Sequence, residues 1–280
     1  MISICVIGAG TMGSGIAQTS AQNGFNTLLF DINTEVVEKA KAAINKSLDF
    51  LVSKEKITSA EKDAIQNRIQ FITNIQQCRA DVIIEAIVEK TEAKVSIFNQ
   101  LAAINNSDTI FASNTSSLSI SHIQSKLNNP QQVVGMHFFN PAQVMKLVEV
   151  VKGKQTAEAV AQKVYNLCLQ LKKTPVMCKD APGFIVNRVA RHYYLEAMKL
   201  VEKNIASIEN VDEIMEASGF KMGPFKLMDL IGNDINLAVS QSLYDAFNQA
   251  ERFTPSPLQV QKVKQGQLGK KTGEGFYKYN

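Results

Sequence analysis

The stretch "ISICVIGAGTMG" constrains the fold of this chain more than any other part of the sequence. An apolar, β-rich run, Ile2–Ile7, leads directly into Gly8, Gly10 and Gly13. Continuous apolar runs of this length are typical of strands buried on both faces of a parallel sheet. Glycines at this spacing allow a tight turn, a close approach of the backbone to a bound group, and close packing of the following helix on the strand. The pattern therefore predicts a buried strand and then a helix from Met12 to Asn23.

Strand-like and helix-like segments alternate from here to about residue 179. The predicted strands are the apolar runs 2–7, 27–30, 80–89, 109–114, 133–139, 146–153 and 174–179. Predicted helices at 91–104, 119–127 and 156–172 lie between them, and two charged helices, 34–53 and 59–68, are expected to extend the sheet domain. Alternation of this kind predicts a mainly parallel sheet with helices on both faces.

The periodicity changes after "KDAPGFIVNR" (179–188). From there to about residue 265 it is helical, and strand-like alternation disappears. We therefore expect an α/β chain, with a Rossmann-type, doubly wound, mainly parallel sheet over residues 1–182. A smaller all-α domain is expected over residues 183–280, with the boundary near Ala181–Gly183.

Composition narrows the class of protein. Of the 280 residues 45% are apolar and 20% charged, and the net charge is only +4, with the basic residues scattered. A disordered chain, or a nucleic-acid binder with a concentrated basic face, is therefore not expected. The four cysteines form no CxxC pair and no His/Cys cluster, so no metal site is predicted. No apolar run has the length of a membrane span and no targeting segment is evident, so the cytoplasm is the expected location.

The glycine pattern has the context of a dinucleotide site. It follows a strand and opens a helix, and Asp31 ends the next strand. The helix N-terminus offers N–H groups and positive potential to phosphates. Asp31 would accept hydrogen bonds from the adenosine ribose hydroxyls and repel a 2′-phosphate, which favours NAD over NADP. An ordinary βα turn with a solvated aspartate is the alternative, and FAD uses a similar fingerprint. The residues expected to contact the cofactor here are Gly8, Ala9, Gly10, Thr11, Met12, Gly13 and Asp31.

Polar residues gather at the carboxyl ends of three predicted strands, which is where open α/β sheets bind ligands. Glu85 and Glu89 lie near the end of one strand, "SNTSS" (113–117) follows the next, and His137 comes at the end of the one after. Any one of these residues alone has an ordinary structural explanation. Their convergence favours a functional site.

The stretch "HFFNPAQVMKLVEVV" raises the question of a base and its orienting acid. Glu149 lies in an apolar strand, where a carboxylate is costly unless it is paired, and the imidazole of His137 is its expected partner. Such a pair fixes the imidazole tautomer and suits general-base chemistry near neutral pH. A purely structural pair is the alternative. Likewise, Ser116 could serve in a helix N-cap, and Asn187 could be an ordinary polar residue early in a helix.

Six motifs together resemble one enzyme family. They are "GAGTMGSGIAQ", "EAIVE", "FASNTSSLSI", "HFFNPAQVMKLVEVV", "PGFIVNR" and "GKKTGEGFYKY", and they span nearly the whole chain in order. On these motifs the chain is identified as a member of the 3-hydroxyacyl-CoA dehydrogenases, most similar to the short bacterial 3-hydroxybutyryl-CoA dehydrogenases.

The resemblance implies a reaction and the residues that carry it. A hydride would pass from C3 of a 3-hydroxyacyl thioester, of the L (S) configuration, to the nicotinamide of NAD. His137 matches the family's general base and Glu149 the acid that orients it. Ser116 and Asn187 match groups that hydrogen-bond the reacting oxygen or the thioester.

The resemblance also implies binding residues and an assembly. Asn140 matches a residue near the nicotinamide and substrate, and Glu89 and Lys94 match cofactor contacts. Ser47 and Lys54 match positions that touch the CoA moiety, although Lys54 could equally be a solvated lysine. The substrate would be an acyl-CoA bound in a cleft between the domains. Family members usually form homodimers through the helical C-terminal domain.

Three other functions stay open at this point. One is a dehydrogenase acting on another 3-hydroxy substrate: a longer or branched acyl-CoA, 3-hydroxyadipyl-CoA, or a free sugar acid such as gulonate. Another is a noncatalytic NAD-binding protein, since fold does not fix function. The third is a helical interaction module that merely binds nucleotide. The presence of His137, Glu149 and Asn187 together argues against the noncatalytic NAD-binding protein.

Overall fold

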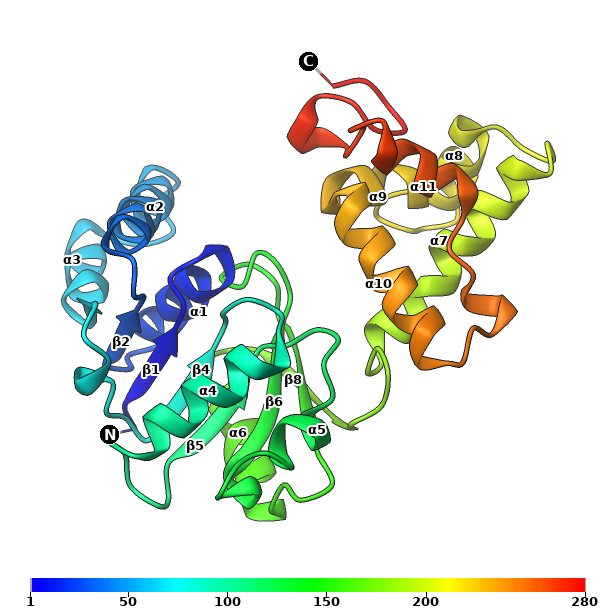
Figure 1. Ribbon diagram of the computed structural model, residues 1–280. Coiled ribbons are helices and arrows are strands. Elements are labelled where there is room, and N and C mark those ends of the chain that lie inside the picture. Colours follow the sequence, from blue (N-terminus) through cyan, green and yellow to red (C-terminus); the bar gives the residue numbers. More distant parts are fainter. Residues whose placement is uncertain (1, 280) are drawn as a thin grey trace. The chain divides into compact units, whose positions relative to one another are not determined.

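The computed structural model describes residues 2–279. These residues form two compact units: an N-terminal unit that ends at Ala181 and a C-terminal unit that begins at Pro182 (Figure 1).

The N-terminal unit is built on one sheet, whose strand order in the described residues is β3-β2-β1-β4-β5-β6-β7-β8. Every neighbouring pair is parallel except β6 and β7, which are antiparallel. The predicted mainly parallel, doubly wound sheet is therefore confirmed. The strands are β1 (Ile4–Ile7), β2 (Thr27–Phe30), β3 (Ile69–Ile72), β4 (Val82–Glu85), β5 (Ile110–Ser113), β6 (Val133–Phe138), β7 (Leu147–Lys152) and β8 (Thr174–Lys179).

Helices cover both faces of the sheet (Figure 1). One face packs on α1, α2, α3 and α6 through an apolar cluster that includes Val6, Ile84 and Met136 of the strands. The other face carries α4 and α5, where the rings of Phe98 and Phe111 meet edge to face. The helices are α1 (Thr11–Gln22), α2 (Thr34–Ser53), α3 (Ser59–Asn67), α4 (Thr91–Ala102), α5 (Ile120–Gln124) and α6 (Glu158–Gln170).

Two features of the sheet differ from the sequence prediction. Strand β3 was not predicted, because it is a short edge strand with Gln70 exposed and it follows α3 almost directly. The strand predicted at 80–89 is wrong beyond Glu85, where the chain turns away and Glu89 lies in a loop. The antiparallel step from β6 to β7 has a simple cause, since the connection 139–146 is shorter than the dozen or so residues that a parallel crossover needs.

The pleat of the sheet places four polar side chains on the same face. Glu85 pairs in register with Ser113, Ser113 with Gly135, and His137 with Glu149. Side chains alternate along a strand and neighbours in register share a face. Glu85, Ser113, His137 and Glu149 therefore all face the side of α4 and α5, opposite the main apolar cluster.

The C-terminal unit is helical in the residues that are described. Its helices are α7 (Val186–Glu202), α8 (Ile208–Ala217), α9 (Pro224–Ile231), α10 (Asn233–Ala246) and α11 (Pro257–Lys264). Its core includes Met198 on α7, Phe225 and Met228 on α9, and Phe276 of the tail. The buried Asp229 fastens that tail, because its carboxylate accepts hydrogen bonds from the Phe276 N–H, the Tyr277 N–H and the Tyr279 hydroxyl. The smaller all-α domain expected from the sequence is confirmed.

The cysteines pack mainly as small buried side chains. Cys5, Cys78 and Cys168 are buried, whereas Cys178 is half-buried, and all are free thiols. Burial raises the pKa of both Cys168 and Cys178 to about 12, so few thiolates are present near neutral pH. No helix within residues 2–279 has the length and apolar character needed to cross a bilayer.

Candidate active site

The glycine loop has the geometry of a site that approaches a ligand through its backbone. Gly8 has φ +95°, and a Cβ there would lie 2.8 Å from the Ala86 carbonyl oxygen. A Cβ on Gly13 would lie 1.7 Å from the Gly8 carbonyl oxygen, so helix α1 can pack on the loop only without a side chain. At Gly10, in contrast, a Cβ would meet nothing within 4 Å. Packing within the protein is therefore enough to require glycine at positions 8 and 13. The open space beside Gly10 is what a bound pyrophosphate requires.

Helix α1 begins at this loop with its N–H groups available to an anion. Gly10 is the N-cap, no side chain of the described residues caps the helix, and its first turn has no acidic residue. The first N–H groups of an α-helix have no partner within the helix, and the dipole favours negative charge there. The start of α1 is thus suited to hold phosphate groups.

Asp31 lies at the carboxyl end of β2 and faces the glycine loop. Its carboxylate accepts hydrogen bonds from the backbone N–H of Ala9 at 2.9 Å and of Asn33 at 3.0 Å. Each carboxylate oxygen can accept a further donor. Asp31 therefore both fixes the loop and keeps acceptor capacity for ribose hydroxyls.

We expect Asp31→Ala to weaken the binding of NADH by about 10-fold or more, since hydrogen bonds to a charged group contribute roughly 1.5–3 kcal/mol. The binding of NADPH should weaken less, because the repulsion between the carboxylate and the 2′-phosphate is removed together with the carboxylate. Fluorescence titration of both cofactors measures the two dissociation constants. Asp31→Asn is the matched control, since it keeps an acceptor for the Ala9 N–H without the charge. Equal weakening of NADH and NADPH by the alanine variant would show that Asp31 does not distinguish them.

His137 and Glu149 form a buried pair across two antiparallel strands. They are direct neighbours in the β6–β7 register, and the distance from His137 Nδ1 to Glu149 Oε2 is 2.8 Å. Only 6% of His137 and 1% of Glu149 is exposed. The Phe139 ring lies against the imidazole, with 4.5 Å between centroids. The carboxylate thus orients the ring through Nδ1, and the packing holds it in place.

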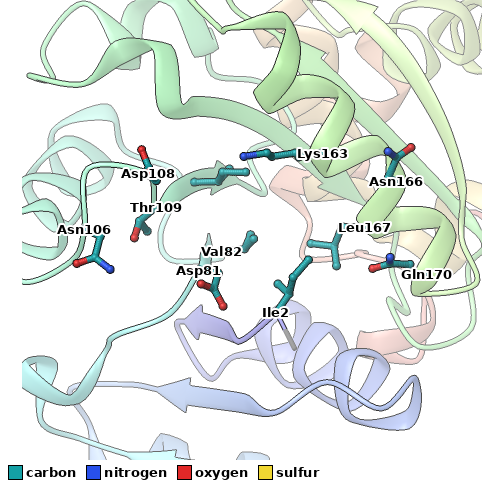
Figure 2. Close-up of a pocket in the computed structure, with 11 residues that line it drawn as sticks. Ile2, Asp81, Val82, Asn106, Asp108, Thr109, Lys163, Asn166, Leu167 and Gln170 are labelled. Carbon is teal, nitrogen blue, oxygen red and sulfur yellow. The ribbon is translucent and has the colours of Figure 1, made fainter.

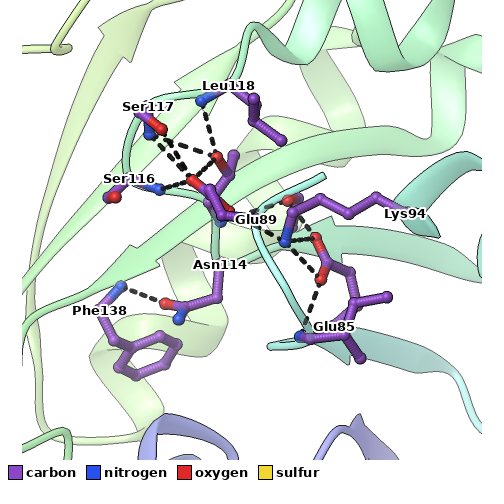
Figure 3. Close-up of polar contacts among 11 residues, drawn as sticks. Glu85, Glu89, Lys94, Asn114, Ser116, Ser117, Leu118 and Phe138 are labelled. Carbon is purple, nitrogen blue, oxygen red and sulfur yellow. Dashed lines mark hydrogen bonds and ion pairs between the residues drawn. The ribbon is translucent and has the colours of Figure 1, made fainter. Parts of the chain in front are cut away.

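Asn114 fixes the backbone immediately after the imidazole. Its side-chain oxygen accepts a hydrogen bond from the Phe138 N–H at 2.8 Å (Figure 3). The β5–β6 ladder has already ended at Ser113 and Gly135, so the asparagine replaces the ladder there. Asn114 belongs to the "SNTSS" motif, but the sequence pattern does not predict it as a site residue.

A buried ionic cluster lies beside these residues, at the carboxyl end of β4. The Lys94 ammonium donates to Glu85 Oε1 and Oε2 at 2.9 and 2.8 Å and lies 3.2 Å from Glu89 Oε2 (Figure 3). The Ser113 hydroxyl also donates to Glu85. Burial raises the pKa of Glu85, and the charge and hydrogen bonds of Lys94 oppose this rise only in part. We call Glu85, Glu89, Lys94 and Ser113 the carboxylate–lysine cluster.

Glu89 organises the loop that carries Ser116. Its Oε1 accepts from the Thr115 hydroxyl at 2.5 Å, the Ser116 N–H at 3.0 Å, and the Ser117 N–H and hydroxyl at 3.2 and 3.0 Å (Figure 3). Burial acts to raise the pKa of Glu89, but the charge of Lys94 and these hydrogen bonds outweigh it, so the pKa is lowered. An ionised carboxylate with this many donors is a strong constraint on the loop.

The N-cap alternative for Ser116 is wrong. The residue that caps α5 is Ser119, whose hydroxyl accepts from the His122 N–H. Ser116 lies earlier, in the loop held by Glu89, at the carboxyl edge of the sheet. Its position is therefore compatible with a role in binding.

The other predicted residues lie in different surroundings. Asn140 is exposed in the connection between β6 and β7, which packs on α1, since a Cβ on Gly15 would lie 3.2 Å from that of Ala142. On α2, the Ser47 hydroxyl accepts from Gln18 at 3.0 Å. Lys54 is exposed at the end of α2, with its ammonium 5.7 Å from the centroid of the Phe50 ring.

Asn187 belongs to the C-terminal unit, in the first turn of α7. In that unit the "GKKTGEG" turn is engaged internally. Lys271 forms an ion pair with Asp234 at 2.6 Å, and the Lys270 ammonium lies 5.5 Å from the Tyr279 ring centroid. Both lysines therefore have partners within this unit.

A cavity of about 490 Å³ lies at the edge of the N-terminal sheet opposite to the glycine loop. Figure 2 shows its lining, which includes Asp81 and Thr109 just before β4 and β5, and Lys163 on α6. These residues precede parallel strands, so they mark the amino edge, away from the ligand-binding edge. None of the predicted site residues lines it. Among the described residues, no group of His, Cys, Asp or Glu is arranged to hold a metal ion.

Comparison with known proteins identifies the family. The profile described as "3-hydroxyacyl-CoA dehydrogenase, NAD binding domain" matches residues 3–181. The profile described as "3-hydroxyacyl-CoA dehydrogenase, C-terminal domain" matches residues 183–279. The chain belongs to the 3-hydroxyacyl-CoA dehydrogenase family. The family predicted from the motifs, the NAD cofactor and the class of NAD-dependent dehydrogenase are thereby confirmed.

Individual relatives of this dehydrogenase carry related names. It is 41% identical to the 3-hydroxybutyryl-CoA dehydrogenase of Clostridioides difficile, over 100% of both chains. It is 45% identical to the 3-hydroxyadipyl-CoA dehydrogenase of Escherichia coli (strain K12), over 98% of this chain, but it spans only 58% of that protein. The crystal structure of (S)-3-hydroxybutyryl-CoA dehydrogenase from Ralstonia eutropha matches it with a TM-score of 0.96 at 40% identity, over 100% of both chains.

Proposed function

We propose that this dehydrogenase interconverts (S)-3-hydroxybutyryl-CoA and acetoacetyl-CoA with NAD. The observation that carries the proposal is the buried His137–Glu149 pair, 2.8 Å apart, on the sheet whose carboxyl edge carries the glycine loop and Asp31. A base with its orienting acid, on the same sheet as a dinucleotide fingerprint, provides the groups needed to oxidise an alcohol.

The two members of the pair have distinct roles in the proposal. His137 Nδ1 is bonded to Glu149, so we assign proton transfer to Nε2. In the oxidation, Nε2 takes the proton of the C3 hydroxyl, and in the reverse reaction it returns the proton to the oxygen. Glu149 holds one tautomer and stabilises the imidazolium in between. The glycine loop and Asp31 would hold NAD, which would supply the acceptor for the hydride from C3.

Other residues of the N-terminal unit are proposed to bind the cofactor and substrate. The loop with Ser116, held by Glu89, would present hydrogen-bonding groups to the reacting oxygen or the thioester. Asn140 would lie near the nicotinamide. Ser47 on α2 and the exposed Lys54 just after that helix would contact CoA, and the ammonium of Lys54 suits the phosphates of CoA. Asn187 is proposed to bind the thioester from the C-terminal unit.

The decisive experiment is an NADH-consumption assay with acetoacetyl-CoA. We expect turnover with NADH well above that with NADPH, and little turnover of the free 3-keto acid. 3-Oxoadipyl-CoA belongs in the same assay, because the 45% identical Escherichia coli relative is named for that chain type. A kcat/KM highest for 3-oxoadipyl-CoA would replace the four-carbon substrate in the proposal. Comparable rates with a free acid would remove the CoA claim, and NADH binding without any turnover would leave a noncatalytic NAD-binding protein.

We further propose a homodimer formed through the C-terminal unit. That unit exposes large apolar side chains, including Val189 on α7, Ile214 on α8 and Leu230 on α9. Exposed apolar side chains of this size are often buried when two protein chains associate. Sedimentation equilibrium tests this, and the mass of a single chain would contradict it. The cytoplasmic location expected from the sequence stays a prediction.

A further inference from the structure

Glu85 is the most deeply buried carboxylate of the candidate site, and the proposed reaction gives it no task. It ends β4, is 0% exposed, and shares the face of the sheet that carries Ser113 and His137. β4 adjoins β1, and the strand order reverses between them, which is the point where doubly wound sheets bind a dinucleotide. An ionisable group is costly at such a depth unless it is well paired.

Oε2 of Glu85 contacts both Lys94 and the turn that lies against the glycine loop. It accepts from the Ile87 N–H at 3.2 Å, which fixes the turn that follows β4. That turn covers the glycine loop, because a Cβ on Gly8 would lie 2.8 Å from the Ala86 oxygen and 3.1 Å from an Ile87 methyl. A displaced turn would therefore disturb Gly8 and the phosphate-binding end of α1.

The other contacts of Glu85 lead to the loop with Ser116. Lys94 is 1% exposed and lies between Glu85 and Glu89, with its ammonium 2.8 Å from one carboxylate and 3.2 Å from the other. Glu89 in turn accepts the Ser116 N–H, and Ser113, which donates to Glu85, immediately precedes this loop (Figure 3). The same carboxylate thus reaches both the glycine loop and the Ser116 loop.

We propose that Glu85 is a positioning residue, which acts through Lys94 and Ile87 to hold the cofactor loop and the Ser116 loop in one arrangement. Lys94 is then the buried counter-charge through which Glu85 positions Glu89. The inference rests on the proposed function for the role of Ser116, but its effect on the glycine loop concerns NADH binding alone.

The charges of the cluster give the proposal a specific signature. Removing the charge of Glu85 alone draws Lys94 towards Glu89, and removing Lys94 alone leaves two carboxylates without their shared cation. Breaking one partner of a buried pair costs far more than replacing both by neutral groups. Glu85→Gln and Lys94→Met should therefore be non-additive, with the double variant closer to the native protein than the product of the two single effects.

The test measures the NADH dissociation constant by fluorescence, and kcat and KM for acetoacetyl-CoA, in both single variants and the double variant. Each single variant should raise the NADH dissociation constant about 10-fold and lower kcat/KM about 100-fold, and the double variant should recover at least about 10-fold of the product in kcat/KM. Glu216→Gln, which makes the same change at the half-buried pair with Lys226 in the C-terminal unit, should alter none of these values.

Two outcomes would overturn the proposal. One is a lower melting temperature for Glu85→Gln with native NADH affinity and native kcat, which would mean a structural role only. The other is a double variant equal to the product of the single effects, which would mean that Glu85 does not act through Lys94. If Glu85→Gln does not fold, Ser113→Ala removes one bond of the cluster, and unchanged NADH affinity and kcat in that variant would count against the proposal. If the native protein binds NADH without using acetoacetyl-CoA, the proposed function fails while the NADH comparison still decides the role of Glu85.

Discussion

Replacing His137 by glutamine is expected to lower kcat for acetoacetyl-CoA reduction by about 10³-fold, within the 10²–10⁴ that general acid–base catalysis contributes. Glutamine is of similar size and can still meet Glu149 with its amide, but it cannot exchange a proton near neutral pH. NADH affinity should stay within about twofold, because the proposed task of the imidazole is proton transfer and not cofactor binding. Steady-state kinetics with NADH titration measures both quantities.

The matched control is His122→Gln. This variant has the same substitution at an exposed position, since the side chain of His122 lies on the surface of α5. Its kcat should be native. A His137→Gln variant with substantial activity would reject the assignment of the base, and a loss confined to NADH affinity would place His137 in cofactor binding instead.

Replacing Glu149 by glutamine is expected to lower kcat by about 10²-fold, with NADH affinity unchanged. The carboxylate accepts only, so it admits one tautomer of His137, whereas an amide can present either its oxygen or its NH₂ group to Nδ1. The amide also lacks the negative charge that stabilises the imidazolium. The loss should appear in kcat rather than in KM, since the pair acts on the proton and not on binding.

Glu158→Gln serves as the control for this change. Glu158 also pairs with a cation, Lys152 of β7, but its side chain is 74% exposed and the pair is screened by water. Native kinetics are expected there. If Glu149→Gln matched the control, the buried pair would be structural, as the sequence had left open.

Much of the cofactor half of the fold could be predicted from local sequence. The run to Ile7, the glycines and Asp31 are close together in the chain, and each residue type answers a local requirement of backbone conformation or charge. The edge strand at Ile69–Ile72 could not be predicted in the same way, because its stability comes from pairing with β2 and not from a pattern of its own.

The cluster around Glu85 shows what the sequence could not give. The sequence predicts that Glu85 lies near the end of a strand. Its partners lie elsewhere, with Lys94 on the following helix and Ser113 on the next strand. Their meeting depends on the β4–β5 register and on which face α4 covers, and neither is encoded in a short window. The one available signal was an acidic residue ending an otherwise apolar strand, the same signal that pointed to Glu149.

The antiparallel step between β6 and β7 makes the alignment of base and acid an all-or-none property. Both side chains stand on one continuous ladder, so their separation follows the backbone hydrogen bonds and not the rotamers of a flexible loop. A slip of a single residue in β7 would turn the carboxylate through to the face of α1 and α6 and leave the imidazole without it. Substrate-binding loops can accordingly diverge by substitution in small steps, whereas an insertion or deletion inside this ladder has no intermediate between a working pair and none.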